Sequence, residues 1–159
     1  MRSALVSIRR IDSRVCDRVT RYATRMGETL KESVSLCVLI VEDDDDSREM
    51  LGEWVTAFGH RHLRAANAEQ ALSHVVQSHP ELALIDLGLP DIDGYEVARR
   101  VRAEAGESLR MIALTGYSDE VSRQAAFAAG FDDFVVKPVL PEVLQGLLRT
   151  DRQPHSRMT

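Results

Sequence analysis

The chain has 159 residues, 44% of them hydrophobic, which is enough for one domain with a buried core. Its formal net charge of −5 argues against direct nucleic-acid binding, because such a surface needs clustered Lys and Arg. Two cysteines, Cys16 and Cys37, are too few for a disulfide framework, and no apolar run approaches the roughly 18 residues of a membrane span. With no secretory signal in the pattern, we expect a soluble, cytoplasmic protein.

The first 34 residues form a basic arm. Residues 1–33 contain eight Arg and Lys against four acids, whereas the rest of the chain is strongly acidic. The arm could be a disordered leader, a solvated helix, or a helix that binds a partner or dimerises. A basic amphipathic helix can also lie on an anionic membrane surface, and Met26 could be the true start of the protein. The helical interpretations rest on apolar residues at three-to-four spacing, namely Ile8, Ile11, Val15, Val19, Tyr22 and Met26.

From Ser35 onward, short apolar runs alternate with amphipathic patterns. The apolar runs predict strands over 36–41, 62–66, 82–85, 109–114 and 134–136. The amphipathic patterns predict helices over 47–58, 67–76, 95–106, 118–129 and 141–148, with the acids at 44–46 near the first helix start. Such alternation is typical of a doubly wound parallel sheet with helices on both faces. We therefore expect a five-stranded α/β domain over 35–150, with the polar strand 62–66 at an edge, followed by a disordered tail over 151–159.

Polar side chains stand at the ends of four of these strands: Glu42 and Asp43, Asp86, Thr115, and Lys137. In an open α/β sheet, ligands bind beyond the carboxyl ends of the strands. Three carboxylates brought together repel one another unless a cation neutralises them, and an all-oxygen site suits Mg²⁺. A lysine and a hydroxyl can stabilise phosphoryl oxygens. The pattern therefore predicts a phosphoryl-transfer site with Asp86 as the nucleophile.

Four motifs follow one another in order, VLIVEDD, ALIDLGLPDIDGYEVARRVR, IALTGYS and AGFDDFVVKPV. Through them residues 35–149 resemble the receiver domain of two-component response regulators, in its single-domain, chemotaxis-regulator-like type. The resemblance implies a flavodoxin-like receiver fold and phosphorylation of Asp86 by a sensor histidine kinase or a histidine phosphotransfer protein. It also implies that Asp43 and Asp86 ligate Mg²⁺, that Glu42 assists, and that the Gly88 carbonyl completes the protein ligands.

The same resemblance assigns roles on the other side of the site. Thr115 and Lys137 would contact the phosphoryl group, and the Lys137–Pro138 bond would be cis. Thr115 and Phe134 would form the switch, with Phe134 standing where the chemotaxis type has tyrosine. Phe134 can still change rotamer but offers no hydroxyl to a partner, and a plain core aromatic is the alternative interpretation.

Only about ten residues follow the last predicted helix, so we expect a phosphorelay switch without a separate output domain. Its downstream protein target would bind the last two helices and strand 134–136, and no enzyme activity beyond self-catalysed phosphorylation and dephosphorylation is expected. A phosphate sink is one alternative. An aspartyl-phosphate hydrolase is another, although such enzymes need a second acid two residues after the nucleophile, where this chain has Gly88. The sequence makes no prediction about the oligomeric state.

Overall fold

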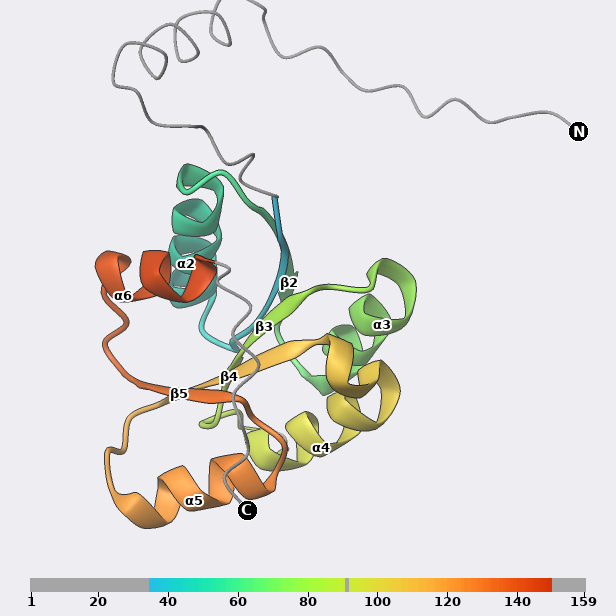
Figure 1. Ribbon diagram of the computed structural model, residues 1–159, viewed down its shortest axis with the longest axis vertical. Helices are drawn as coiled ribbons and strands as arrows, with labels where there is room; N and C mark the ends of the chain where they lie inside the picture. The colour runs from blue at the N-terminus through green and yellow to red at the C-terminus, as the bar shows by residue number, and fades with distance from the viewer. Residues whose placement is uncertain (1–34, 91, 150–159) are drawn as a thin grey trace, which may run out of the picture. The chain divides into compact units, whose positions relative to one another are not determined.

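The computed structural model describes residues 35–90 and 92–149, so the arm over 1–34 and the tail over 151–159 lie outside the described residues. Strands and helices alternate along this part of the chain, as predicted (Figure 1). The strands are β1 (Cys37–Val41), β2 (Arg61–Ala65), β3 (Leu82–Asp86), β4 (Arg110–Thr115) and β5 (Asp133–Val136). The helices are α2 (Asp45–Ala57), α3 (Ala68–Ser78), α4 (Gly94–Ala105), α5 (Glu120–Ala128) and α6 (Pro141–Leu148).

The strands form one parallel sheet in the order β2-β1-β3-β4-β5. The predicted five-stranded doubly wound fold is therefore confirmed, and the polar strand β2 does lie at an edge. Chain order reverses between β1 and β3, because β1 pairs with β2 on one side and with β3 on the other. At such a switch point the loops on either side diverge and leave room for a ligand at the carboxyl edge.

Both faces of the sheet are covered by helices, as Figure 1 shows. Alternate residues of β1 point to opposite faces: Leu39 and Val41 pack with α3, α4 and α5, whereas Val38 and Ile40 pack with α2 and α6. The central strands are buried along their whole length, which explains their continuous apolar runs. The ends of these strands are therefore packed between helices on both sides.

Two helix starts differ from the prediction by two residues because side chains cap them. The Asp44 carboxylate accepts a hydrogen bond from the Ser47 backbone N–H at 2.8 Å, so α2 begins at Asp45 rather than at 47. The Asp119 carboxylate accepts from the Ser122 N–H at 2.9 Å, so α5 begins after it rather than at 118. The acids at 44–46 thus lie at a helix start, as expected, where the helix dipole favours them.

Two strands end one residue later than predicted. Asp86 is the last residue of β3 and Thr115 the last of β4, whereas the sequence pattern places both just after the strands. The ladder continues because Asp86 lies opposite Leu114, and the Leu87 N–H donates to the Leu114 carbonyl at 2.9 Å. The backbone of both residues is consequently held in the sheet and does not belong to a loop.

Among residues 35–90 and 92–149, no helix is long and apolar enough to cross a membrane. Cys37 is a free, buried thiol at the start of β1. Burial raises its pKa above the ordinary value for a thiol, and this keeps the thiol protonated and unreactive.

Arg102, in the last turn of α4, joins this helix to the segments that follow α4 and α5. Its guanidinium donates to the carbonyls of Gly130 at 2.7 Å, Leu109 at 2.7 Å and Gly106 at 2.7 Å, and to Asp132 at 2.8 Å. The side chain is only 16% exposed, so loss of these bonds would leave carbonyls partly buried and unpaired.

We expect Arg102→Ala to lower the free energy of unfolding by about 3 kcal/mol, because several charge-assisted hydrogen bonds are lost at once. Arg100→Ala is the matched control, since Arg100 lies on the same helix, is half exposed and pairs with Glu96. Its effect should stay below about 0.5 kcal/mol. Urea unfolding of both variants measures this difference, and equal losses would contradict the role of Arg102.

Candidate functional site

Four strands deliver polar side chains to one edge of the sheet. β1 ends at Val41 and is followed by Glu42 and Asp43, β3 ends at Asp86, β4 ends at Thr115, and β5 is followed by Lys137. Since β1, β3, β4 and β5 are consecutive in the sheet, the structure brings all these residues to one edge. Glu42, Asp86 and Thr115 are buried, with exposures of 2%, 6% and 2%, whereas Asp43 is exposed.

Glu42, Asp43 and Asp86 form an acidic cluster. One carboxylate oxygen from each lies within 4.8 Å of the other two. This spacing lets a single cation contact all three oxygens, and a set of hard oxygen ligands open to solvent on one side suits Mg²⁺. The donor set therefore fits the ion that the sequence predicts.

Lys137 lies against this cluster from β5. Its Nζ is 2.8 Å from Glu42 Oε2 and 3.1 Å from Asp86 Oδ2. Burial on its own favours the neutral amine, but the hydrogen bonds and charges of the two carboxylates outweigh it and raise the pKa of Lys137. The lysine thus stays charged and holds one oxygen of each carboxylate.

The environment of Glu42 favours the neutral form of its carboxyl group. Its pKa is raised above the ordinary value, mainly because burial penalises the carboxylate and also because Asp86 is close, while the hydrogen bond from Lys137 opposes the shift. One lysine therefore does not fully compensate the buried negative charge. A further positive charge at this edge would lower the energy of the cluster.

Asp86 presents its two oxygens to different partners. Oδ1 accepts a hydrogen bond from the Gly88 backbone N–H at 3.0 Å, and Oδ2 faces Lys137. These contacts fix the orientation of the carboxylate. The Gly88 backbone therefore lies beside the acidic cluster, where its carbonyl is predicted to bind the cation.

Gly94 makes this placement possible, and sequence reasoning had missed it. A Cβ at this position would lie 2.6 Å from the Asp86 carbonyl oxygen and 2.6 Å from the Leu87 Cα, both backbone atoms that cannot move aside. The first turn of α4 therefore packs directly on the end of β3. A side chain there would push α4 away from the strand that carries Asp86.

We expect Gly94→Ala to lower the free energy of unfolding by about 2 kcal/mol, since overpacking against backbone forces the elements apart. Gly146→Ala is the control, because a Cβ at this position in α6 would meet nothing within 4 Å. That variant should be neutral or more stable by up to about 1 kcal/mol, owing to the helix propensity of alanine. Thermal and urea unfolding test the pair, and a harmless Gly94→Ala would refute the close packing.

Thr115 lies at the end of β4 with its hydroxyl partly engaged. Its Oγ1 accepts a hydrogen bond from the Tyr117 N–H at 3.1 Å, and its carbonyl accepts from the Lys137 N–H at 2.7 Å. The hydroxyl proton can still be donated to an incoming oxygen. Thr115 and Lys137 are thus linked through the backbone of neighbouring strands.

Phe134 is half-buried in β5, opposite Ala113 of β4, and packs against the core on the α3–α5 side of the sheet. Thr115 lies in β4 two residues beyond Ala113, the residue opposite Phe134. A movement of Thr115 would therefore take place close to Phe134. The Lys137–Pro138 peptide bond is cis, as the resemblance implies. The position of Phe134 is compatible with both the switch and the core-aromatic interpretation.

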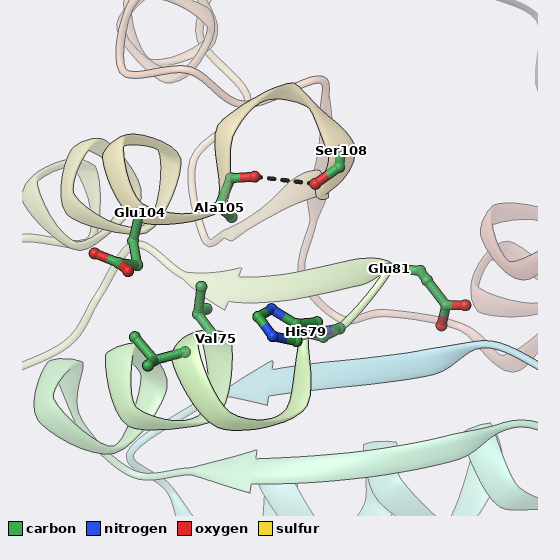
Figure 2. A pocket seen from close by; sticks show the side chains of 8 residues that line it. Val75, His79, Glu81, Glu104, Ala105 and Ser108 are labelled. Atoms are coloured by element: carbon green, nitrogen blue, oxygen red, sulfur yellow. Dashed lines mark hydrogen bonds between the residues drawn. The ribbon is translucent and has the colours of Figure 1, made fainter.

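A pocket at the amino-terminal end of β3 is separate from the acidic cluster, Thr115 and Lys137. Figure 2 shows it between the ends of α3 and α4, close to the start of β3. Its volume is about 300 Å³. The Ser108 hydroxyl at its wall donates to the Ala105 carbonyl at 3.0 Å. Glu81 precedes β3 whereas Asp86 ends it, so the pocket lies a strand length from the acidic cluster.

A parallel α/β sheet whose carboxyl edge gathers an acidic cluster, a hydroxyl and a lysine defines a class of phosphoryl-transfer and signalling domains. Residues 38–149 match the model of the response regulator receiver domain, and the chain belongs to this family. An uncharacterised 14.6 kDa protein of Leptolyngbya boryana is 42% identical over 105 residues, which cover 65% of this chain and 80% of that protein.

Two other similar proteins are a transcriptional regulator and the receiver domain of a sensor kinase. The transcriptional regulatory protein AfsQ1 of Streptomyces coelicolor is 39% identical over 112 residues, covering 70% of this chain and 49% of AfsQ1. The chain thus spans only about half the length of that curated relative. The receiver domain of the sensor histidine kinase PA1611 from Pseudomonas aeruginosa, solved with a magnesium ion in its active-site cleft, superposes with a TM-score of 0.65 at 29% identity. This match covers 72% of this chain and 95% of that one.

Proposed function

We propose that this receiver domain accepts a phosphoryl group on Asp86 in a Mg²⁺-dependent reaction, with a histidine kinase or histidine phosphotransfer protein as donor. The observation that carries the proposal is the joint position of the acidic cluster, Lys137 and Asp86 at one strand edge. Magnesium in the active-site cleft of the PA1611 receiver domain supports the choice of metal. Because such a donor obtains its phosphoryl group from ATP, we propose that this protein acts in the cytoplasm.

In the proposed reaction, a carboxylate oxygen of Asp86 attacks the phosphorus of the donor phosphohistidine. The bond between phosphorus and the imidazole nitrogen breaks, its electron pair leaves with the imidazole, and the imidazole takes up a proton from solvent. Asp86 then carries an acyl phosphate. Bound Mg²⁺ would supply charge neutralisation to the phosphoryl oxygens, held by Glu42, Asp43, Asp86 and the Gly88 carbonyl.

Lys137 and Thr115 would act on the phosphoryl group from the other side. The lysine ammonium faces Asp86 Oδ2 at 3.1 Å and can transfer one of its hydrogen bonds to a phosphoryl oxygen. The Thr115 hydroxyl can donate to another. Both residues would be drawn toward the acyl phosphate, and this movement would reach β5, where Phe134 is the proposed switch residue.

The partner-binding face would lie on α5, β5 and α6. Large apolar side chains are exposed there, among them Val121 at 77%, Leu140 at 53% and Val143 at 41%. Val136 directly precedes Lys137 in the chain and is 38% exposed, so a change at the lysine would alter this surface. We propose that a downstream protein target reads the phosphorylation state at this face.

The experiment is to incubate the protein with acetyl phosphate in Mg²⁺ and, in parallel, in EDTA, and to follow the intact mass. We expect one phosphoryl group per chain in Mg²⁺ and none in EDTA. Transfer from autophosphorylated histidine kinases would then identify the donor by its rate. No labelling in Mg²⁺, or equal labelling in EDTA, would overturn the proposed function.

A further inference from the structure

Arg48 reaches back from the first turn of α2 to the loop after β1. Its Nη1 donates to the Glu42 carbonyl at 2.8 Å and to the Asp43 carbonyl at 3.2 Å. Its Nη2 forms an ion pair with Asp45, and the side chain is only 16% exposed. These contacts are unlike those of a solvated helix residue, because the guanidinium binds backbone that precedes its own helix.

The two carbonyls belong to the residues whose carboxylates enter the acidic cluster. A guanidinium is planar and donates in fixed directions, so two carbonyls on one nitrogen set the orientation of the peptides around them. Glu42 is also held by its own N–H, which donates to the Ala65 carbonyl at 3.0 Å. Asp43 is exposed, and the bond from Arg48 restrains its backbone beside the cation position.

We propose that Arg48 is a positioning residue for the metal site: it holds the β1–α2 loop so that the Glu42 and Asp43 carboxylates face Asp86. This inference rests on the proposed function, since it assumes that Mg²⁺ binds at the acidic cluster. Arg48 does not touch the cation; it acts through the backbone of two ligands. Groups that orient metal ligands typically contribute 10- to 100-fold to metal affinity.

The sign of the effect separates this role from plain electrostatics. A positive charge near a cation site repels the cation, so removing Arg48 would strengthen Mg²⁺ binding if charge alone mattered. The positioning role predicts weaker binding instead. The ion pair with Asp45 already offsets much of the arginine charge, which favours the positioning effect.

The test is an NMR titration of the whole chain with Mg²⁺ alone, using the amide shifts of Asp43 and Gly88 to obtain the dissociation constant. We expect Arg48→Gln to weaken Mg²⁺ binding about 10-fold. Arg99→Gln is the matched control, because Arg99 forms the same i,i+3 ion pair, with Glu96, on exposed α4 surface. Its affinity should equal that of the wild type. Unfolding in EDTA gives the stability of each variant separately.

Each outcome has one meaning. If wild type binds Mg²⁺ and Arg48→Gln binds equally or more tightly, the inference is overturned even if that variant is less stable. If wild type shows no binding, the proposed function fails instead. Arg48→Lys keeps the charge but loses the planar fork, so it should bind more weakly than wild type. It decides the question if the glutamine variant does not fold, and wild-type affinity in Arg48→Lys would then reject the positioning role.

Discussion

Replacing Asp86 with asparagine should abolish phosphorylation by acetyl phosphate, to the level seen without protein, while the domain stays folded. Asparagine has nearly the shape of aspartate and its side-chain oxygen can keep the hydrogen bond from the Gly88 N–H. It cannot attack phosphorus as a carboxylate does. The loss would therefore come from chemistry and not from a change of fold.

Stability gives this prediction an internal check. Asp86 lies close enough to Glu42 to raise the pKa of that buried carboxyl, after burial itself. Removing the Asp86 charge should therefore leave the metal-free protein as stable as wild type or more so. Asp46→Asn, an exposed acid in the first turn of α2, is the control and should label normally. Intact mass and urea unfolding measure both effects, and undiminished labelling of Asp86→Asn would refute the assignment.

Replacing Lys137 with methionine should have the second large effect, on the stability of the metal-free protein. Methionine keeps the length of the side chain but leaves Glu42 and Asp86 without their shared cation. Because the lysine side chain is 33% exposed, we expect a loss of about 2 kcal/mol and not the full cost of a buried pair. Mg²⁺ should restore more stability to this variant than it adds to wild type.

Two further measurements show whether the lost charge is the cause. Adding Glu42→Gln to Lys137→Met removes one of the unpaired charges, so the double variant should recover stability relative to Lys137→Met alone. Phosphorylation should change hydrogen exchange over β5 and α6 in wild type, and phosphorylated Lys137→Met should lack this change. A single variant as stable as wild type without metal, or one with a normal exchange response, would remove Lys137 from the proposed mechanism.

The fold could be predicted because its determinants are local. Continuous apolar runs such as 36–41 and 82–85 are typical of strands covered on both faces, and Pro141 marks the start of α6 as the pattern indicates. The boundaries cannot be read from the pattern where a single side chain decides them. Asp44 and Asp119 each cap a helix, and a cap depends on a rotamer that the pattern does not show.

The residues of the site could be predicted for a different reason. Parallel strands end at one edge, so acids that follow separate apolar runs meet there without any contact being known in advance. The contacts themselves were not predictable. Lys137 follows β5, which is separated from β3 by β4, and its long side chain still contacts both Glu42 and Asp86, which no local pattern shows. Gly94 approaches the β3 backbone through the packing of α4, which no local motif reveals.

Arg48 shows most clearly which contacts a sequence pattern does not predict. In the sequence it stands three residues after Asp45 and has the pattern of a surface ion pair. That ion pair does form, but the same guanidinium also binds the Glu42 and Asp43 carbonyls. Whether such an arginine is a solvated surface residue or holds the metal-site loop, as we propose, depends on the direction of its side chain, which the sequence does not show.

The measurement that tests the central claim most directly is chemical mapping of the phosphorylated residue. The protein is phosphorylated in Mg²⁺, reduced with borohydride, which converts an aspartyl phosphate to homoserine, and digested for mass spectrometry. We predict homoserine at position 86 and unmodified acids at Glu42 and Asp43. Homoserine at Asp43, or a phosphoryl group that resists reduction on a histidine, would contradict Asp86 as the phosphoacceptor.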